Sequence, residues 1–389
     1  MFIFNIFRKK KKLDAPWEKY YSKDDLAVKI PNISIYDQVR NSYKKYPNNV
    51  AVQYLGKKTN YKNFIKQIDN AAKGFSEIGI KNGDIVTILL PNIPESLISL
   101  YALNKIGAIA NMTHPLSAEE EIKETLISTK SKYLIIFDER YDKIENFINN
   151  LEMKKVIFVS PSDSLNFIKR SIYKISKFKK HKHYPKQANF ISWRNFYNKA
   201  KRAEEINVKK FGRNTPAVII HSGGTNGIPK NIVIQNRAFI FAAMGEQIDL
   251  IRLNSGDSAL AIMPNFHGFG LSVLMHTPLA LGCSTILVPT FDSKKFDTLF
   301  KKTRPTCVLG VPTLFEALAN SSNERNLDLS FLKYVISGGD LLPQNLEDKV
   351  NKYLSDHNST AKITQGYGLS EALACVTMAH DDVNKSGSV

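Results

Sequence analysis

The sequence is poor in cysteine, and its few cysteines are scattered. Cys283, Cys307 and Cys375 are the only three in 389 residues, and no two of them form a Cys-x-x-Cys pair. This spacing excludes a disulfide framework and a cysteine zinc site, and it is typical of a protein of the reducing cytosol. We therefore expect a cytoplasmic location.

Acidic residues are also scarce relative to basic ones. There are 54 Lys and Arg against 36 Asp and Glu, which gives a net charge of +18. Most of the excess lies in two segments: residues 1–12 hold five cations and no acid, and residues 165–210 hold fourteen cations against two acids. Neither segment has a recognition helix, a zinc finger or an aromatic ribonucleoprotein signature, so we expect no nucleic-acid partner.

Both basic segments also carry apolar side chains. In 1-MFIFNIFRKKKK-12 the cations follow the apolar run, the reverse of the order in a secretory signal peptide. In 165-LNFIKRSIYKISKFKK-180 four apolar residues recur at helical spacing among lysines, which predicts a basic amphipathic helix. Two interpretations stay open: the segments rest peripherally on an anionic membrane surface, or they pack on the domain or act as solubilising tails.

No uninterrupted apolar run of membrane-spanning length is present. Residues 258–289 contain no Lys, Arg, Asp or Glu, but prolines, glycines and an asparagine divide them into short pieces: Pro264, Asn265, Gly268, Gly270, Pro278 and Gly282. These pieces are too short for about 30 Å of hydrocarbon, so we interpret them as buried core.

Strand-like and helix-like segments alternate along most of the chain. The first series is 85-IVTILL-90, a helix at 94–107, a helix at 118–130, 133-YLIIF-137 and 156-VIFVS-160. A second series runs through 217–220, 285–289, a helix near 293–302, 306–312, a helix at 313–320 and 333–339. This is the βαβ rhythm of a parallel sheet covered on both faces. The break at about 161–212 predicts a basic insertion.

The stretch 221-HSGGTNGIPKNIVI-234 predicts a phosphate-binding loop between two strands. It is not a Walker-type P-loop, because Pro229 precedes the lysine, Asn231 follows it, and a strand rather than a helix comes next. Its amides and hydroxyls, with Lys230, can still surround an oxyanion. An ordinary hairpin loop is the alternative.

Three later stretches are suggestive only as a set. They are 263-MPNFHGFG-270 with His267, 335-VISGGD-340 at the end of a strand, and 363-ITQGYGLSEA-372 with Tyr367 and Glu371. Taken singly, each has a structural explanation, such as a core histidine, a tight turn, a packed aromatic ring or a helix N-terminal charge.

In this order the four stretches resemble the adenylate-forming superfamily of acyl- and aryl-CoA synthetases, luciferases and peptide-synthetase adenylation domains. The family's loop Ser-Gly/Ser-Gly-Thr-Thr/Ser-Gly-x-Pro-Lys-Gly is matched from Ser222 to Lys230, with Asn226 for a hydroxyl residue and Asn231 for a glycine. Its Pro-x-Phe-His-x-x-Gly is matched at 264–270, and its Tyr-Gly-x-Thr-Glu at 367–371, with Ser370 for threonine. Residues 108–122 also look like the segment before its first core helix. The resemblance covers residues 30 to 389 and favours acyl-CoA synthetases.

The resemblance implies an α/β fold: a large domain of two layered sheet-and-helix subdomains plus a smaller β-rich part, spanning residues 30–389 after a basic extension at 1–29. It also implies ATP, Mg²⁺ and coenzyme A as cofactors. Lys230, His267 and Glu371 would be catalytic, with Glu371 holding Mg²⁺. The nucleotide would contact Ser222, Gly223, Gly224, Thr225, Asn226, Gly227, Lys230, Gly338, Gly339, Asp340, Gln365, Gly366, Tyr367, Gly368 and Ser370.

Family chains continue beyond the point where this sequence ends. Residues 385-KSGSV-389 look like the start of the family's Lys-x-Gly-Ser-Val-Gly-x-Pro. The Thr-Gly-Asp aspartate for the ribose, the hinge and the small domain with the adenylation lysine would follow. We therefore expect a truncated or incomplete chain whose own activity is weak or absent.

The resemblance also limits the class of substrate that we expect. Adenylation domains for amino acids usually carry an aspartate at the position of His267, and 266-FHGFGL-271 offers no anion for an ammonium group. We expect ATP-dependent activation of a medium- or long-chain fatty acid to acyl-AMP and then acyl-CoA. The alternatives are a ligase that loads a carrier protein's phosphopantetheine, and a non-catalytic nucleotide-binding membrane adaptor.

Overall fold

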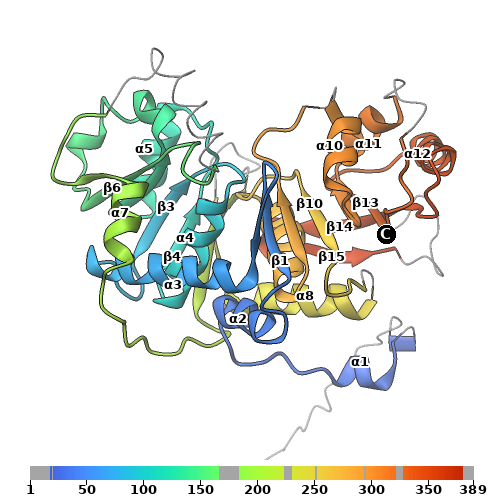
Figure 1. The fold of residues 1–389 in the computed structure, drawn as a ribbon, viewed down its shortest axis with the longest axis horizontal. Helices are drawn as coiled ribbons and strands as arrows, with labels where there is room; N and C mark the ends of the chain where they lie inside the picture. Colours follow the sequence, from blue (N-terminus) through green and yellow to red (C-terminus); the bar gives the residue numbers. More distant parts are fainter. Residues whose placement is uncertain are drawn as a thin grey trace, which may run out of the picture. The chain divides into compact units, whose positions relative to one another are not determined.

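The structure is a computed structural model that describes residues 18–19, 21–165, 184–222, 230–249, 252–292, 295–320 and 327–379. It divides into two compact units, Met1–Ile30 and Pro31–Val389. The described part of the first unit contains the short helix α1 (Lys23–Ala27). The second unit holds two multi-stranded sheets with their helices (Figure 1).

The first sheet, sheet A, has eight strands in the order β15-β14-β13-β12-β10-β11-β1-β2. They are β1 (Val50–Tyr54), β2 (Lys57–Asn60), β10 (Ser258–Ala261), β11 (Ser284–Leu287), β12 (Cys307–Gly310), β13 (Tyr334–Gly338), β14 (Ile363–Leu369) and β15 (Ala374–Met378). All neighbouring pairs are parallel except β1–β2 and β14–β15.

The second sheet, sheet B, has seven strands in the order β7-β6-β5-β3-β4-β8-β9. They are β3 (Ile85–Leu89), β4 (Ile109–Met112), β5 (Tyr133–Phe137), β6 (Lys155–Val159), β7 (Phe190–Ser192), β8 (Pro216–Ser222) and β9 (Lys230–Gln235). Only the β8–β9 hairpin is antiparallel, and it ends with Ser222 opposite Lys230.

The helices of the second unit cover both faces of the sheets. They are α2 (Ile35–Lys45), α3 (Tyr61–Glu77), α4 (Pro94–Lys105), α5 (Glu119–Ser128), α7 (Trp193–Ala200), α8 (Asn236–Asp249), α9 (Thr277–Ala280), α10 (Phe296–Thr303), α11 (Pro312–Ala319) and α12 (Gln344–Asp356). Short 3-10 turns are η2 (Asp138–Lys143), η3 (Ile148–Asn150) and η6 (Ser370–Ala372), and η4 (Phe269–His276) is a π-helix.

Alternating side chains of the strands enter different cores. Val308 and Val335 of sheet A pack with residues of α10, α11 and α12, whereas Leu309 and Ile336 join the largest core. That core also takes residues of sheet B and of α2, α3, α4 and α9. A third core lies between sheet B and α5. Parallel strands buried on both faces account for the predicted β-branched runs, and the predicted α/β class with two sheet-and-helix subdomains is confirmed.

Most of residues 258–289 are buried, as their sequence predicted, whereas His267 is exposed. Among the described residues, none of the helices combines the length and the apolar character that crossing a membrane requires. Within the range expected to be an insertion, β7 pairs with β6, and α7 packs on α3. The N-terminal basic segment and residues 166–180 of the predicted amphipathic helix lie outside the described residues.

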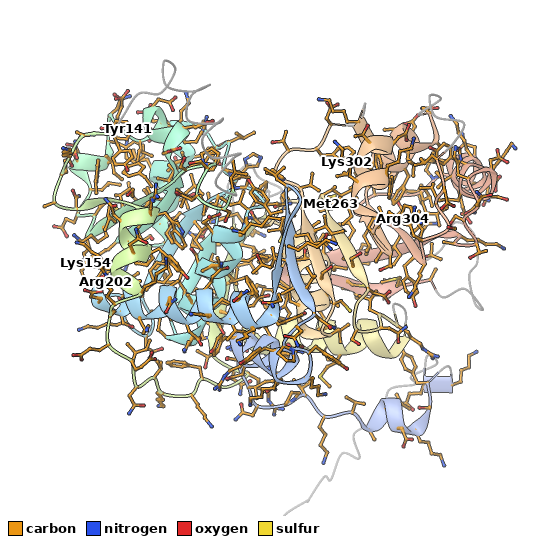
Figure 2. All side chains as sticks on the ribbon, viewed as in Figure 1. Tyr141, Lys154, Arg202, Met263, Lys302 and Arg304 are labelled. Atoms are coloured by element: carbon orange, nitrogen blue, oxygen red, sulfur yellow. The ribbon has the colours of Figure 1, made fainter. Side chains whose placement is uncertain are left out.

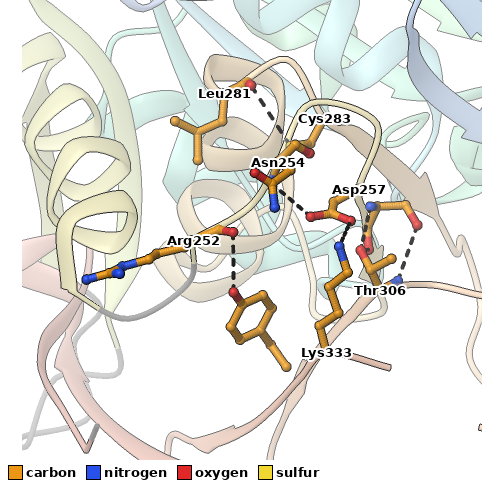
Figure 3. A network of polar contacts seen from close by, with 9 residues as sticks. Arg252, Asn254, Asp257, Leu281, Cys283, Thr306 and Lys333 are labelled. Carbon is orange, nitrogen blue, oxygen red and sulfur yellow. Dashed lines mark hydrogen bonds and ion pairs between the residues drawn. The ribbon is translucent and has the colours of Figure 1, made fainter. Parts of the chain in front are cut away.

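A polar network ties together the amino-terminal ends of the central strands of sheet A (Figure 3). Asp257, which precedes β10 and is buried, accepts from the backbone N–H of Asn254 at 2.8 Å and from Lys333 Nζ at 2.7 Å. Lys333 precedes β13, so this ion pair joins strands that are separated in the sheet by β12. The network holds the amino-terminal ends of these strands in register. The loops that follow the strands lie at the opposite edge of the sheet.

We predict that Lys333→Met destabilises the protein by about 1–3 kcal/mol, because it leaves the buried Asp257 carboxylate with one charge-assisted bond fewer. Urea unfolding monitored by tryptophan fluorescence measures the change. Lys352→Met is the matched control: Lys352 pairs with Asp356 on an exposed face of α12, where such pairs contribute less than about 1 kcal/mol. Equal losses in the two variants would contradict the prediction.

Candidate active site

A cavity of about 320 Å³ lies where the central strands of sheet A end. Its lining combines the turn around His267, the π-helix η4, the ends of β12 and β13, and the β14–β15 hairpin. The lining residues are Met263, His267, Gly268, Phe269, Val273, Leu309, Val311, Ile336, Ser337, Gly338, Gly339, Gly366, Tyr367, Gly368, Leu369, Ser370, Cys375 and Met378. The carboxyl ends of parallel strands are the usual place for a ligand in open α/β sheets.

Two asparagines fix the turn that carries His267 against sheet B. The side-chain amide of Asn92, which follows β3, donates to the carbonyl of Met263 (labelled in Figure 2) at 2.9 Å. Asn92 Oδ1 in turn accepts from the backbone N–H of Asn265 at 3.0 Å. The amide of Asn265 donates to the carbonyls of Leu90 and Pro91. The His267 turn is therefore positioned by both sheets.

Close backbone contacts explain the glycines of this turn. A Cβ on Gly268 would lie 2.6 Å from the carbonyl oxygen of Leu373, and a Cβ on Gly270 would overlap the carbonyl of Pro264. Leu373 is itself in the left-handed region, with φ 67°, between η6 and β15. The His267 turn thus packs directly on the segment that follows Glu371.

The other two glycine-rich stretches meet on neighbouring strands. Gly338 pairs with Gly366, and a Cβ on Gly338 would lie 3.2 Å from the Gly366 carbonyl oxygen. Gly339 has φ +83°, which only glycine adopts without strain, and it turns the chain out of β13. Tyr367 follows on β14 with 50% of its surface exposed, so its side chain is accessible to a ligand.

The β8–β9 hairpin of sheet B reaches the same region. It carries Ser222 and the exposed Lys230 on opposite strands, and both of its strands contact η6. Glu371 lies in η6 and is exposed. The predicted cation and the predicted magnesium ligand therefore lie on adjoining segments that come from different sheets.

Not every predicted residue lines the cavity. The side chain of Gln365 is buried and accepts from the backbone N–H of Leu342 at 3.3 Å, so it supports the loop after β13. Asp340 is exposed beside the cavity and caps its own loop by accepting from the N–H of Leu341. Gly223, Gly224, Thr225, Asn226 and Gly227 lie outside the described residues.

Several lining residues were not among those predicted. Leu309 and Val311 could have been found, because they lie at the end of a predicted strand whose carboxyl end faces the site. Phe269 and Val273 belong to a stretch whose sequence predicts only buried core. Cys375 lies on β15, a strand with no sequence signal of its own, and it enters the cavity by pairing opposite Gly368.

His267 is exposed at the cavity, but the protein around its ring still affects its pKa. Desolvation lowers the pKa of its imidazole, and the nearby His114 lowers it further. The ring is therefore neutral at neutral pH. The hydroxyl of Ser337 is buried in the cavity wall and has no hydrogen-bond partner among the described residues.

Comparison with known proteins shows to which proteins this chain is related. The family described as AMP-binding enzyme matches residues 39–389. A long-chain-fatty-acid–CoA ligase of Bacillus subtilis is 28% identical over 380 residues, which cover 96% of this chain and 67% of the ligase. 4-Coumarate–CoA ligase 3 of Arabidopsis thaliana is 26% identical over 79% of this chain and 50% of its own length. The crystal structure of an anthranilate CoA ligase in complex with anthranoyl-AMP has a TM-score of 0.78 at 18% identity, and covers 94% of this chain and 64% of that chain. This chain thus spans half to two thirds of the length of these relatives.

The contact between Gly268 and Leu373 makes a prediction about stability. Gly268→Ala should lower the free energy of unfolding by about 1–3 kcal/mol, because the new methyl group meets backbone atoms that cannot rotate away. Gly245→Ala in α8 is the control, since nothing lies within 4 Å of its added Cβ, and it should be neutral or stabilise by up to about 1 kcal/mol. Thermal and urea unfolding measure both. A Gly268→Ala protein as stable as the parent would show that the close approach is wrong.

Proposed function

Because the chain belongs to the AMP-binding enzyme family, we propose that it provides the site in which ATP activates a carboxylic acid, which is then transferred to the thiol of coenzyme A. One observation carries the proposal: three of the four glycine-rich stretches line a single cavity, and the hairpin of the fourth contacts η6 at its edge. Residues between 222 and 378 are thereby brought to one place.

The proposed reaction needs positioning and charge neutralisation more than a protein nucleophile. The carboxylate oxygen attacks the α-phosphorus of ATP and the bond to pyrophosphate breaks, giving acyl-AMP. The thiol then attacks the acyl carbon, loses its proton and displaces AMP. Tyr367 would stack on adenine, with Gly338 and Gly339 along its edge, and His267 would lie between the α-phosphate and the acyl group.

The exposed groups at the cavity edge suit the phosphates. Lys230 would face the β- and γ-phosphates from the β8–β9 hairpin, and Ser222 would add a hydroxyl. Glu371 offers the hard oxygen that Mg²⁺ prefers. No group of three or more His, Cys, Asp or Glu in the described part of the chain could hold a metal ion. Magnesium would therefore arrive with the nucleotide, which neutralises its phosphates.

The acid is proposed to be a medium- or long-chain fatty acid. The deeper cavity wall is apolar, with Phe269, Val273, Leu309 and Ile336, and no Asp, Glu, Lys or Arg is among the described residues that line it. Such a wall favours an uncharged acyl group over an amino acid. The similarity to a fatty-acid ligase supports an alkyl chain, and the similarity to coumarate ligases makes an aromatic acid the competing substrate.

Two further proposals concern acceptor and location. The thiol could instead be the phosphopantetheine of a carrier protein, and a chain that binds nucleotide without turnover would act as an adaptor.

The basic segments at 1–12 and 165–180 are proposed to contact an anionic membrane surface, from which fatty acids could be supplied. Vesicle co-sedimentation with anionic and neutral lipid, at low and high salt, tests the membrane contact.

We expect the 389-residue chain to bind dodecanoyl-sulfamoyladenosine, a stable analogue of acyl-AMP, at least about tenfold more tightly than 4-coumaroyl-sulfamoyladenosine. The reason is the larger apolar area that the alkyl chain buries in the cavity. Isothermal titration calorimetry measures both affinities without requiring turnover. The reverse order would favour an aromatic acid, and failure to bind adenosine and both analogues would refute the proposed function.

Loss of the stacking ring should weaken every adenosine-containing ligand. Tyr367→Ala is expected to reduce the affinity for adenosine about 5- to 150-fold, the usual cost of losing one base–aromatic stack. Phe241→Ala is the control, because Phe241 is an exposed aromatic residue of α8 that does not line the cavity. An unchanged affinity in Tyr367→Ala would remove this ring from the adenine site.

A further inference from the structure

A second histidine, His114, lies beside the His267 turn although it comes from the other sheet. It follows β4 of sheet B, and its ring centroid is 4.3 Å from that of Phe266. The Phe266 ring is in turn 4.6 Å from that of His267. The two imidazoles therefore contact a common aromatic ring, and His114 is close enough to lower the pKa of His267.

The backbone fixes how His114 presents its ring. The N–H of Leu116 donates to His114 Nδ1 at 2.9 Å, so Nδ1 carries no proton in the neutral ring. The proton is consequently on Nε2, the atom farther from the backbone. His114 is exposed, so this N–H donor is available to a ligand.

The electrostatic surroundings keep both rings uncharged until an anion binds. Desolvation lowers the pKa of His114, and Arg140 acts in the same direction, whereas Glu121 opposes them. Desolvation and His114 together lower the pKa of His267. Arg140 is engaged with the carbonyl of Ser117 at 2.9 Å, and Glu121 accepts from the N–H of Ala118. These two charges are therefore held at the start of α5.

An oxyanion in the cavity would need a hydrogen-bond donor such as His114. No Lys or Arg is among the described residues that line it, and His267 is the one basic side chain there. Lys230 is on the β8–β9 hairpin, beyond the lining. An oxyanion beside His267 would otherwise have a single imidazole to balance its charge.

We propose that His114 is a second anion-binding residue of this site and that, with His267, it hydrogen-bonds one oxyanion, either the phosphate of the nucleotide or the carboxylate of the acid. The inference rests on the proposed function and deepens it, because it assigns a role to a residue outside the cavity lining. An anion on Nε2 favours the charged imidazole, in which Nδ1 carries a proton and gives up its bond from the Leu116 N–H. The protein should therefore take up protons when the anion binds. The sign follows: affinity for the anion rises as the pH falls.

The test measures affinity against pH from 6.0 to 8.5 by calorimetry with the whole 389-residue chain. The first probe is adenosine 5′-sulfate, whose charge is constant over this range, and adenosine is its anion-free control. The second is octanoate added to the protein saturated with adenosine, which presents a carboxylate alone. The variants are His114→Asn, which keeps a polar side chain but cannot become charged, and His114→Phe, which keeps the ring contact with Phe266.

For the parent chain we expect affinity for one of the two anions to rise about tenfold from pH 8.5 to 6.0, while affinity for adenosine stays constant. Either substitution of His114 should reduce the rise to about threefold, because one of the two imidazoles remains. A rise with adenosine 5′-sulfate assigns His114 to the phosphate, and a rise with octanoate assigns it to the carboxylate.

His357→Asn is the matched control, since His357 lies at the end of α12 and its Nδ1 contacts the carbonyl of Tyr353. It should keep the full pH dependence. A pH dependence that is absent for both anions, or unchanged in both His114 variants, overturns the inference while adenosine binding upholds the proposed function. Absence of all binding overturns the proposed function itself.

Discussion

The site depends on one constraint: parallel strands that are bonded in register end at the same edge of their sheet. In sheet A the strands β10, β12, β13 and β14 run in one direction, so the segments that follow them all emerge together. Residues from 263 to 378 therefore meet around one cavity, although they lie far apart along the chain. The Asp257–Lys333 pair secures the opposite edge, where a shift of one strand would displace its loop by a whole residue.

Antiparallel strands at two sheet edges complete the arrangement. β14 and β15 form a hairpin that brings Cys375 and Met378 back to the cavity, and β8 and β9 form another that carries Lys230. Contacts of η6 with β8 and β9 join these hairpins. Charged groups thus gather where the two sheets approach, and apolar groups stay within sheet A. The separation suits a ligand with one polyanionic end and one apolar end.

Much of this architecture could be predicted, because its strands are buried on both faces and so appear as continuous β-branched runs. The predicted segments at 85–90, 133–137 and 156–160 correspond to β3, β5 and β6, and the helix at 94–107 corresponds to α4. The assignment of strands to two separate sheets had no local signal. β1 joins sheet A by pairing with β11, more than two hundred residues away. Such a contact depends on the packing of both partners.

The residues of the candidate site likewise include some that the sequence could predict and some that it could not. His267, Gly338, Gly339 and Tyr367 could be selected because their stretches combine glycine with a chemically useful side chain, and the cavity contains all four. Gln365 lies in one of these stretches, yet the pleat turns it toward Leu342. His114 lies in a stretch that carried no assigned role, because its importance comes from Phe266 on the other sheet. The spacing of residues along the chain does not show which residues become neighbours where two sheets meet.

The contact between Gly268 and the carbonyl of Leu373 has a consequence for how this protein can change. Leu373 is two residues after Glu371, and its backbone is held in a left-handed conformation at the start of β15. A shift of the turn that carries His267 must therefore be transmitted to the turn that carries Glu371. The two regions form one mechanical unit. Replacing the His267 turn by that of a relative should succeed only when residues 370–378 are exchanged with it, and an evolutionary change in either segment would have to alter both together.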